Sequence, residues 1–170
     1  MRNALGWWWH TPHDLLDKID ETNLVRDTRV FVHTLWRLLS DPVLPLDFAA
    51  HAAALVDELT ALRTSLGGRL SVDELIVAAE SLKGRAAGAH SDAALISASR
   101  ALAPVHYTTG DRFAHDPALP LPGWPVLDPL RKLAKVAPGT DSARLLTVSA
   151  MRGRNRLAYA LRNANEALAG

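Results

Sequence analysis

The sequence has no cysteine, no excess of charge of either sign and no long apolar run. The absence of cysteine among 170 residues excludes a disulfide framework, a thiolate metal site and a cysteine nucleophile. Lys and Arg number 19 against 18 Asp and Glu, and a net charge of +1 is too balanced for a dedicated nucleic-acid binder. No apolar run approaches the ~20 residues that a membrane span needs. The first ten residues lack the apolar core of a secretory signal peptide, which favours a cytoplasmic location.

What the sequence has in abundance is apolar residues at helical spacing, whereas patterns typical of strands are nearly missing. Asp20 or Thr22 can cap a first helix, which Pro42 and Pro45 end. The apolar positions of this segment extend past half of its circumference, although a surface helix needs a stripe only ~100° wide. We therefore expect this helix to be covered on two sides. Its apolar side is formed by Leu24, Val25, Thr28, Phe31, Val32, Leu35, Trp36, Leu38 and Leu39.

Capping signals mark the starts of further helices. The second helix begins near Asp47 and closes at the glycine pair 67–68, which favours a left-handed C-cap. The sequence Ser71–Glu74 is a capping box and predicts the start of a third helix. The Ser91-Asp92 pair can cap a short fourth helix, which we expect Pro104 to stop.

A Pro-rich stretch separates these helices from the last ones. Residues 104–129 hold six of the ten prolines, and so long an irregular stretch is usually functional or part of an interface. A short helix from about Val126 to Val136 follows, and Thr140 or Asp141 caps a long final helix that runs towards Leu168. The sequence therefore predicts an all-α protein. We expect an antiparallel helical bundle of about four main helices plus short ones, with one long Pro-rich loop.

The densest chemical signal is the segment Trp7-Trp8-Trp9-His10-Thr11-Pro12-His13-Asp14. Histidine beside a carboxylate suits zinc, because neutral imidazole is a ligand and the carboxylate can bind the metal or orient the ring. The same residues also fit a simpler interpretation, in which Thr11 is a helix N-cap, Asp14 completes a start similar to a capping box and both histidines are solvated. Spacing alone leaves both interpretations open.

The other histidines and the arginine run of residues 152–156 form no recognisable site. Since the remaining histidines have no partner at ligand spacing, we expect each to be packed or on the surface. They are His33, His51, His90, His106 and His115. Helical geometry would spread Arg152, Arg154 and Arg156 over ~200° of a cylinder. We therefore expect these arginines to pair with carboxylates of neighbouring helices rather than to bind nucleic acid.

The segment from Trp9-His10-Thr11-Pro12 to Asp17-Lys18-Ile19 resembles a motif of the dinuclear zinc peptidase family. That family includes bacterial zinc aminopeptidases, glutamate carboxypeptidases and the non-catalytic transferrin receptor. The residues Leu24–Leu39 are similar to the family's following helix, and Asp41–Asp47 resembles its link into a helical dimerisation domain. Residues 107–127 look like the long apical loop of that domain and the start of its next helix.

The resemblance implies a division of the chain at residue 40. Residues 1–40 would be the C-terminal end of a peptidase domain, and residues 41–170 would be a helical dimerisation domain similar to that of the transferrin receptor. By the family's motif, His10 would be the last zinc ligand. Arg112 and Phe113 would face the substrate in an assembled enzyme.

The same resemblance implies that the chain is not catalytic alone. The family's other zinc ligands and its glutamate base belong to an α/β domain that this sequence lacks, and a dinuclear site needs several ligands. We therefore expect an oligomerisation module that forms a homodimer and binds no metal by itself. The alternative is the C-terminal part of a zinc aminopeptidase or carboxypeptidase, in which His10 completes the zinc site of a partner catalytic domain.

Overall fold

The computed structural model describes residues 6–108 and 122–169. All of their regular elements are helical and none is a strand, so the predicted all-α fold is confirmed. The chain divides into two compact units, Met1–Pro45 and Leu46–Gly170. The division predicted at residue 40, between the end of a peptidase domain and a dimerisation domain, stays a prediction.

The first unit holds a 3-10 helix, η1 (Leu16–Lys18), and the 20-residue helix α1 (Glu21–Ser40). Asp20 caps α1 as predicted, because its Oδ1 atom accepts a 2.8 Å hydrogen bond from the N–H of Asn23. At the other end Arg37 pairs with Asp41 over 2.7 Å, and the helix ends before Pro42. No residue of α1 is buried.

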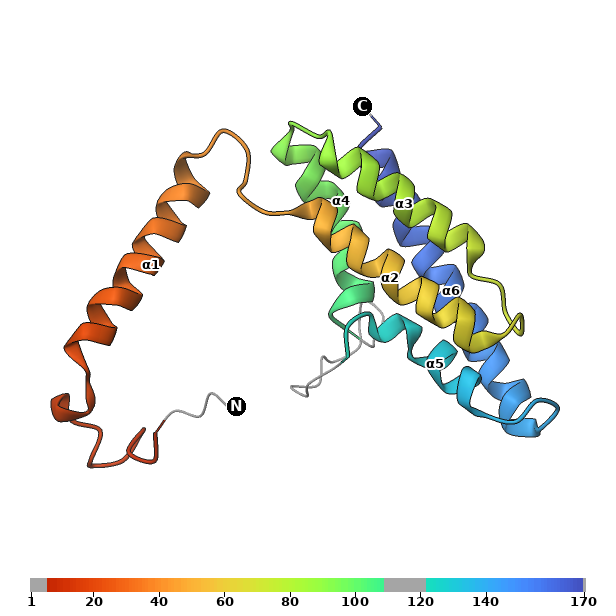
Figure 1. The fold of residues 1–170 in the computed structure, drawn as a ribbon, viewed down its shortest axis with the longest axis horizontal. Helices are drawn as coiled ribbons and strands as arrows, with labels where there is room; N and C mark the ends of the chain where they lie inside the picture. The colour runs from red at the N-terminus through yellow and green to blue at the C-terminus, as the bar shows by residue number, and fades with distance from the viewer. Residues whose placement is uncertain (1–5, 109–121, 170) are drawn as a thin grey trace. The chain divides into compact units, whose positions relative to one another are not determined.

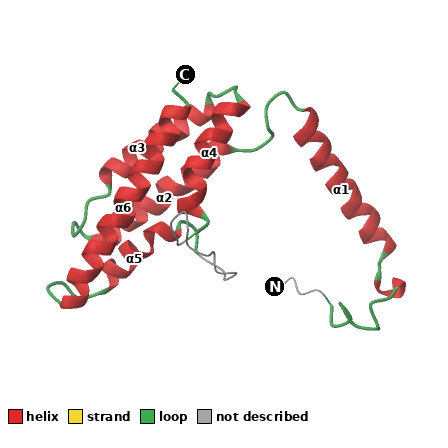
Figure 2. Ribbon diagram, turned by 180° about the vertical axis from the view of Figure 1, so that it is seen from behind, coloured by secondary structure: helices red, strands yellow, loops and turns green. Residues whose placement is uncertain are grey.

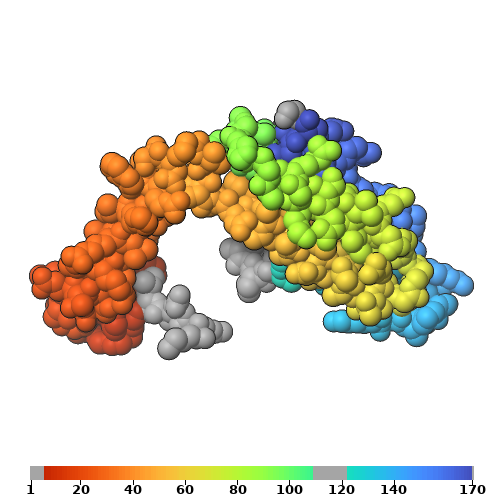
Figure 3. Space-filling view, turned by 45° about the horizontal axis from the view of Figure 1, so that its top comes forward, coloured from red at the N-terminus to blue at the C-terminus, as the bar shows by residue number. Residues whose placement is uncertain are grey.

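The second unit is a helical bundle (Figures 1 and 2). Its longest helix contacts three other helices, and its first helix packs on two. The elements are α2 (Phe48–Leu66), α3 (Asp73–Ala87), α4 (Asp92–His106), the 3-10 helix η2 (Pro125–Leu127), α5 (Asp128–Lys135) and α6 (Asp141–Ala167). Helix α6 packs on α3, α4 and α5, while α2 packs on α3 and α5. Figure 3 shows α2 and α3 side by side on the surface of this unit.

Leucines and small residues form the core of the bundle. Leu55 and Leu59 of α2 and Leu157 of α6 are fully buried. Small residues of α6 let its neighbours approach closely, and Gly153 is the tightest of them. A Cβ atom at Gly153 would lie 2.5 Å from the carbonyl oxygen of Val126, so the backbone of η2 rests directly on α6.

Most helix ends lie where the capping signals predict them. The side chains of three N-cap residues accept hydrogen bonds from backbone N–H groups in the first turns of α2, α4 and α6. These residues are Asp47, Ser91 and Thr140. Helix α2 closes at Gly67, which has the left-handed φ of +56° that its C-cap requires. The short helix expected near residues 126–136 forms as η2 followed by α5.

Two predictions about helix ends are wrong. Ser71 does not form a capping box, because its Oγ atom accepts a hydrogen bond from the N–H of Asp73 (3.3 Å) and Val72 takes the N-cap position. Pro104 does not stop α4, which continues to His106. Pro104 lies in the last turn, so its missing N–H removes a single intrahelical hydrogen bond.

None of the described helices combines the length and the apolar character that crossing a bilayer requires.

Candidate functional site

A continuous apolar surface runs along α1. At 100° per residue, eight large apolar side chains fall within an arc of about 160°. This apolar face consists of Leu24, Val25, Phe31, Val32, Leu35, Trp36, Leu38 and Leu39, with exposed fractions from 38% to 86%. Each of these eight side chains is exposed, and they form one side of the helix.

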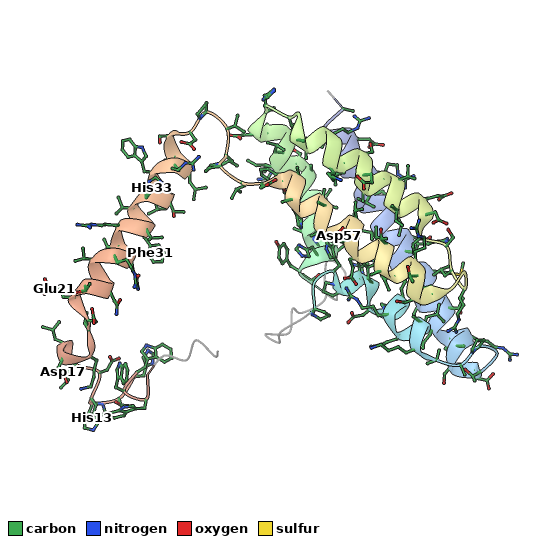
Figure 4. All side chains as sticks on the ribbon, viewed as in Figure 1. His13, Asp17, Glu21, Phe31, His33 and Asp57 are labelled. Carbon is green, nitrogen blue, oxygen red and sulfur yellow. The ribbon has the colours of Figure 1, made fainter. Side chains whose placement is uncertain are left out.

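The opposite side of α1 is polar, with Arg26, Arg29, His33 and Arg37 on it. Figure 4 labels one residue of each side, Phe31 and His33. Val30 lies among the polar residues and is 61% exposed, a fraction close to the 60% of Val32 on the apolar face. These two valines differ in the side of the helix that they occupy and in little else.

The apolar face is large for an exposed surface. Full burial of an aliphatic side chain corresponds to ~60–120 Å², and an aromatic one buries ~150–250 Å². With the exposed fractions given above, the eight side chains present roughly 500 Å² of apolar area on one copy. Contiguous patches of this size mark interaction sites on soluble proteins.

The tryptophan–histidine segment before α1 forms turns in which both histidines are exposed, but Thr11 does not act as a helix N-cap. The N–H of His10 donates to Asp14 Oδ2 (3.2 Å), and the N–H of His13 donates to Thr11 Oγ1 (3.2 Å). His10 has a φ of +60°, and its ring lies 3.9 Å from that of Trp9, centroid to centroid. Both histidines are exposed. Thr11 and Asp14 thus satisfy backbone donors, and the imidazole of His10 faces solvent.

Within the described residues no three His, Asp or Glu side chains gather as a metal site would require. The role of His10 as a zinc ligand accordingly stays a prediction. Arg112, Phe113 and His115 lie outside the described residues.

Two histidines that are 55 residues apart meet in the bundle beside a tryptophan. His51 Nε2 of α2 lies 2.9 Å from His106 Nδ1 at the end of α4. The indole of Trp124 stacks on both rings, with centroid distances of 5.1 Å to His51 and 4.2 Å to His106. We call these three residues the His–Trp cluster.

Arg131 holds the backbone around Trp124. Its guanidinium donates to the carbonyl oxygens of Gly123 (2.7 Å) and Trp124 (3.4 Å) and pairs with Glu58 of α2 (2.8 Å). Trp124 has a φ of +55°, which is rare for an aromatic residue, and its side chain is only 3% exposed. The ion pair and the stacked rings together keep this unusual conformation in place.

Partial burial lowers the pKa values of the two histidines in the His–Trp cluster. Desolvation lowers the pKa of His51 below its ordinary value of 6.5. The pKa of His106 is also lowered, mainly by desolvation and in addition by the charge of His51. A neutral pair can still share one hydrogen bond, because one ring nitrogen donates and the other accepts. Sequence analysis missed this cluster, since no local spacing relates residue 51 to residue 106.

No known protein family, curated protein or solved structure matches this chain. The resemblance to zinc peptidases and to the transferrin-receptor dimerisation domain therefore stays a prediction.

Proposed function

We propose that this chain is an assembly module that forms a homodimer through the apolar face of α1. The observation that carries the proposal is a 20-residue helix with no buried residue and eight exposed large apolar side chains on one side. Two copies of the apolar face together would bury roughly 1,000 Å², which is the lower limit for a specific interface.

The spacing of the apolar face favours a helix as its partner. Leu24, Phe31, Leu35 and Leu38 lie at positions that, together with Thr28, alternate by four and three, which is the spacing of a coiled-coil seam with one polar position. A two-fold axis would place this seam against itself, so that the same residues meet from both copies. The polar side with its arginines would then remain in solvent.

Val32 and Val30 provide the test of this proposal. The variant Val32→Asp places a carboxylate within the apolar face, where burial without a partner opposes association. The variant Val30→Asp makes the same chemical change at the same exposure on the polar side. In sedimentation velocity we expect the parent and Val30→Asp to be dimers. We expect the dissociation constant of the Val32→Asp dimer to be at least tenfold higher, since a loss of ~1.4 kcal/mol in binding free energy already raises this constant tenfold.

Three outcomes would contradict dimerisation through this face. The parent chain could remain a monomer at high micromolar concentration, or both aspartate variants could change the mass equally. In the third, Val32→Asp would lower the free energy of unfolding of a monomer, and the apolar face would then be covered within a single chain.

A relationship to zinc-dependent exopeptidases forms a separate part of the proposal. The motif at residues 9–19 and the link at residues 41–47 support it, and the exposed imidazole of His10 is compatible with a ligand offered to another domain. In the alternative function the chain would complete a zinc site in a partner catalytic domain. Dimerisation through α1 does not depend on this relationship.

A further inference from the structure

If α1 dimerises as proposed, its two copies can run parallel or antiparallel along the seam of positions 24, 28, 31, 35 and 38. In the parallel direction the two-fold axis runs along the helices, so each seam residue meets its own counterpart. In the antiparallel direction the axis crosses the helices, so a residue near one end meets a residue near the other end. The side chains of the seam and of its two flanks favour one of these directions.

Side-chain size within the seam favours the antiparallel direction. Thr28 is the smallest seam residue, and Phe31, which Figure 4 labels, is the largest. Parallel helices would pair Thr28 with Thr28 and Phe31 with Phe31, which leaves a gap in one layer and crowds the next. Antiparallel helices can place Thr28 opposite Phe31 and Leu24 opposite Leu35, so that a small residue faces a large one. This register pairs residues 21–38 of the two copies and leaves only the last two residues of α1 unpaired.

The two flanks of the seam differ in polarity. Val25, Val32 and Leu39 each follow a seam residue and extend the apolar face, with exposed fractions of 43%, 60% and 86%. Asp27 and Thr34 each precede a seam residue and form the other flank. A two-fold axis that crosses the helices keeps like flanks on the same side, so the apolar flanks meet and the polar flanks meet. Parallel helices would instead set each apolar flank against a polar one, with the Asp27 carboxylate beside Val32.

We propose that two copies of α1 pair antiparallel, around a two-fold axis that crosses the helices between residues 29 and 30. Leu24 then contacts Leu35 of the second copy, and Thr28 contacts Phe31. In this arrangement the C-terminal ends of the two α1 helices lie ~30 Å apart, at a rise of 1.5 Å per residue. The two chains therefore continue towards their second units from opposite ends of the helix pair.

Cysteine cross-linking tests the direction, because the chain has no cysteine of its own. Leu24→Cys and Leu35→Cys are oxidised alone and as an equal mixture. A disulfide needs Cα atoms within about 7 Å, whereas in antiparallel copies residues 24 and 35 each lie ~16 Å along the axis from their own counterparts. We therefore expect the mixture to cross-link at least tenfold faster than either variant alone. Val30→Cys, on the polar side, is the control and should cross-link slowly in every sample.

Spin labels give a second measurement that leaves the seam unchanged. Ser40→Cys carries a nitroxide at the exposed C-terminal end of α1. Antiparallel copies place the two labels ~30 Å apart along the axis, and the width of the helix pair brings the full distance to ~40 Å. Parallel copies would hold both labels at the same level, less than ~30 Å apart. Pulsed electron paramagnetic resonance measures this distance, and we expect the longer value.

The antiparallel pairing is overturned if Leu24→Cys and Leu35→Cys cross-link as fast alone as in the mixture. A label distance below ~30 Å would overturn it as well. In both cases sedimentation velocity of the parent chain would still show a dimer, so dimerisation through α1 would stand. A monomeric parent chain with no measurable label distance would remove dimerisation itself, and the pairing direction with it.

Discussion

Trp124 joins three helices of the bundle although it lies outside all of them. Its left-handed backbone costs about 1–3 kcal/mol, and the surrounding contacts must offset that cost. The indole is buried against His51 and His106, and Arg131 binds its carbonyl oxygen while pairing with Glu58. The strain at this residue is thus held by groups from α2, α4 and α5.

The His–Trp cluster makes the stability of the bundle dependent on pH. Because the folded-state pKa values of His51 and His106 are lowered, the unfolded chain binds protons first as the pH falls below 6.5. The two neutral histidines therefore contribute their full stabilisation above pH 6.5. This contribution declines as the pH falls from 6.5 towards the pKa values of the folded state. Urea unfolding at about pH 7.5 and about pH 5.5 should show a lower midpoint at the acidic value.

The variant His51→Gln should reduce this difference between the two midpoints. His33→Gln, which changes an exposed histidine of α1, should leave the difference as it is in the parent. If the urea midpoints at the two pH values differ by the same amount in the parent, His51→Gln and His33→Gln, the His–Trp cluster does not cause the pH dependence.

Gly153 and Gly84 lie inside helices but should respond in opposite ways to alanine. At Gly153 the new methyl group would meet the Val126 carbonyl oxygen at 2.5 Å, whereas nothing lies within 4 Å of a Cβ at Gly84. Gly153→Ala should lower the free energy of unfolding by about 1–3 kcal/mol through overpacking. Gly84→Ala should raise it by about 0.4–1 kcal/mol, because the helix loses a flexible residue. Urea denaturation measures both, and stabilisation by Gly153→Ala would contradict the close contact.

Helix α5 has only eight residues and takes its C-terminal cap from another part of the chain. Arg69, which follows α2, donates from Nη1 to the carbonyl oxygens of Leu133 (2.6 Å) and Val136 (2.8 Å). These carbonyls have no partner within their own helix. The positive charge of the guanidinium also stabilises this end of the helix, because the C-terminus is the negative end of the helix dipole. The second unit therefore holds α5 through a long-range contact rather than by the helix propensity of its residues.

Arg69→Met tests this contact because it keeps the aliphatic stem and removes the donors. The free energy of unfolding should fall by about 1–3 kcal/mol, as expected for hydrogen bonds from a charged group. Arg63→Met is the matched control, since Arg63 makes an exposed 3.6 Å ion pair with Asp73. Its effect should stay within about 0.5 kcal/mol in the same chemical denaturation. Similar losses in both variants would mean that charge, and not capping, explains the result.

The elements that the sequence predicted well are those with local causes. Asp20, Asp47 and Thr140 cap helices because the groups that they bind lie three residues further along the chain. The end of α4 was predicted too early, since a proline in the last turn removes only one intrahelical hydrogen bond and the helix continues past Pro104. The His–Trp cluster could not be predicted, because its residues lie far apart in the sequence and become neighbours only when the bundle has formed.

At the scale of the whole molecule, the two units use their apolar residues differently. The second unit buries its leucines between helices, whereas α1 has none of its residues buried. The periodicity of the sequence predicted the broad apolar side of α1 correctly, and the coverage that it also predicted for this helix stays a prediction. A sequence shows where a wide apolar stripe lies on a helix. What covers it depends on partners that the sequence does not name.

The exposed face of α1 has a consequence for how this helix folds. In proteins most of the stability of a helix comes from packing of its apolar face, and α1 contains several β-branched residues with low helix propensity, among them Val25, Val30 and Val32. If a second copy supplies the missing burial, the coil-to-helix transition of α1 and the meeting of two chains become one equilibrium. The helix content of the first unit would then rise with protein concentration, while that of the bundle would not.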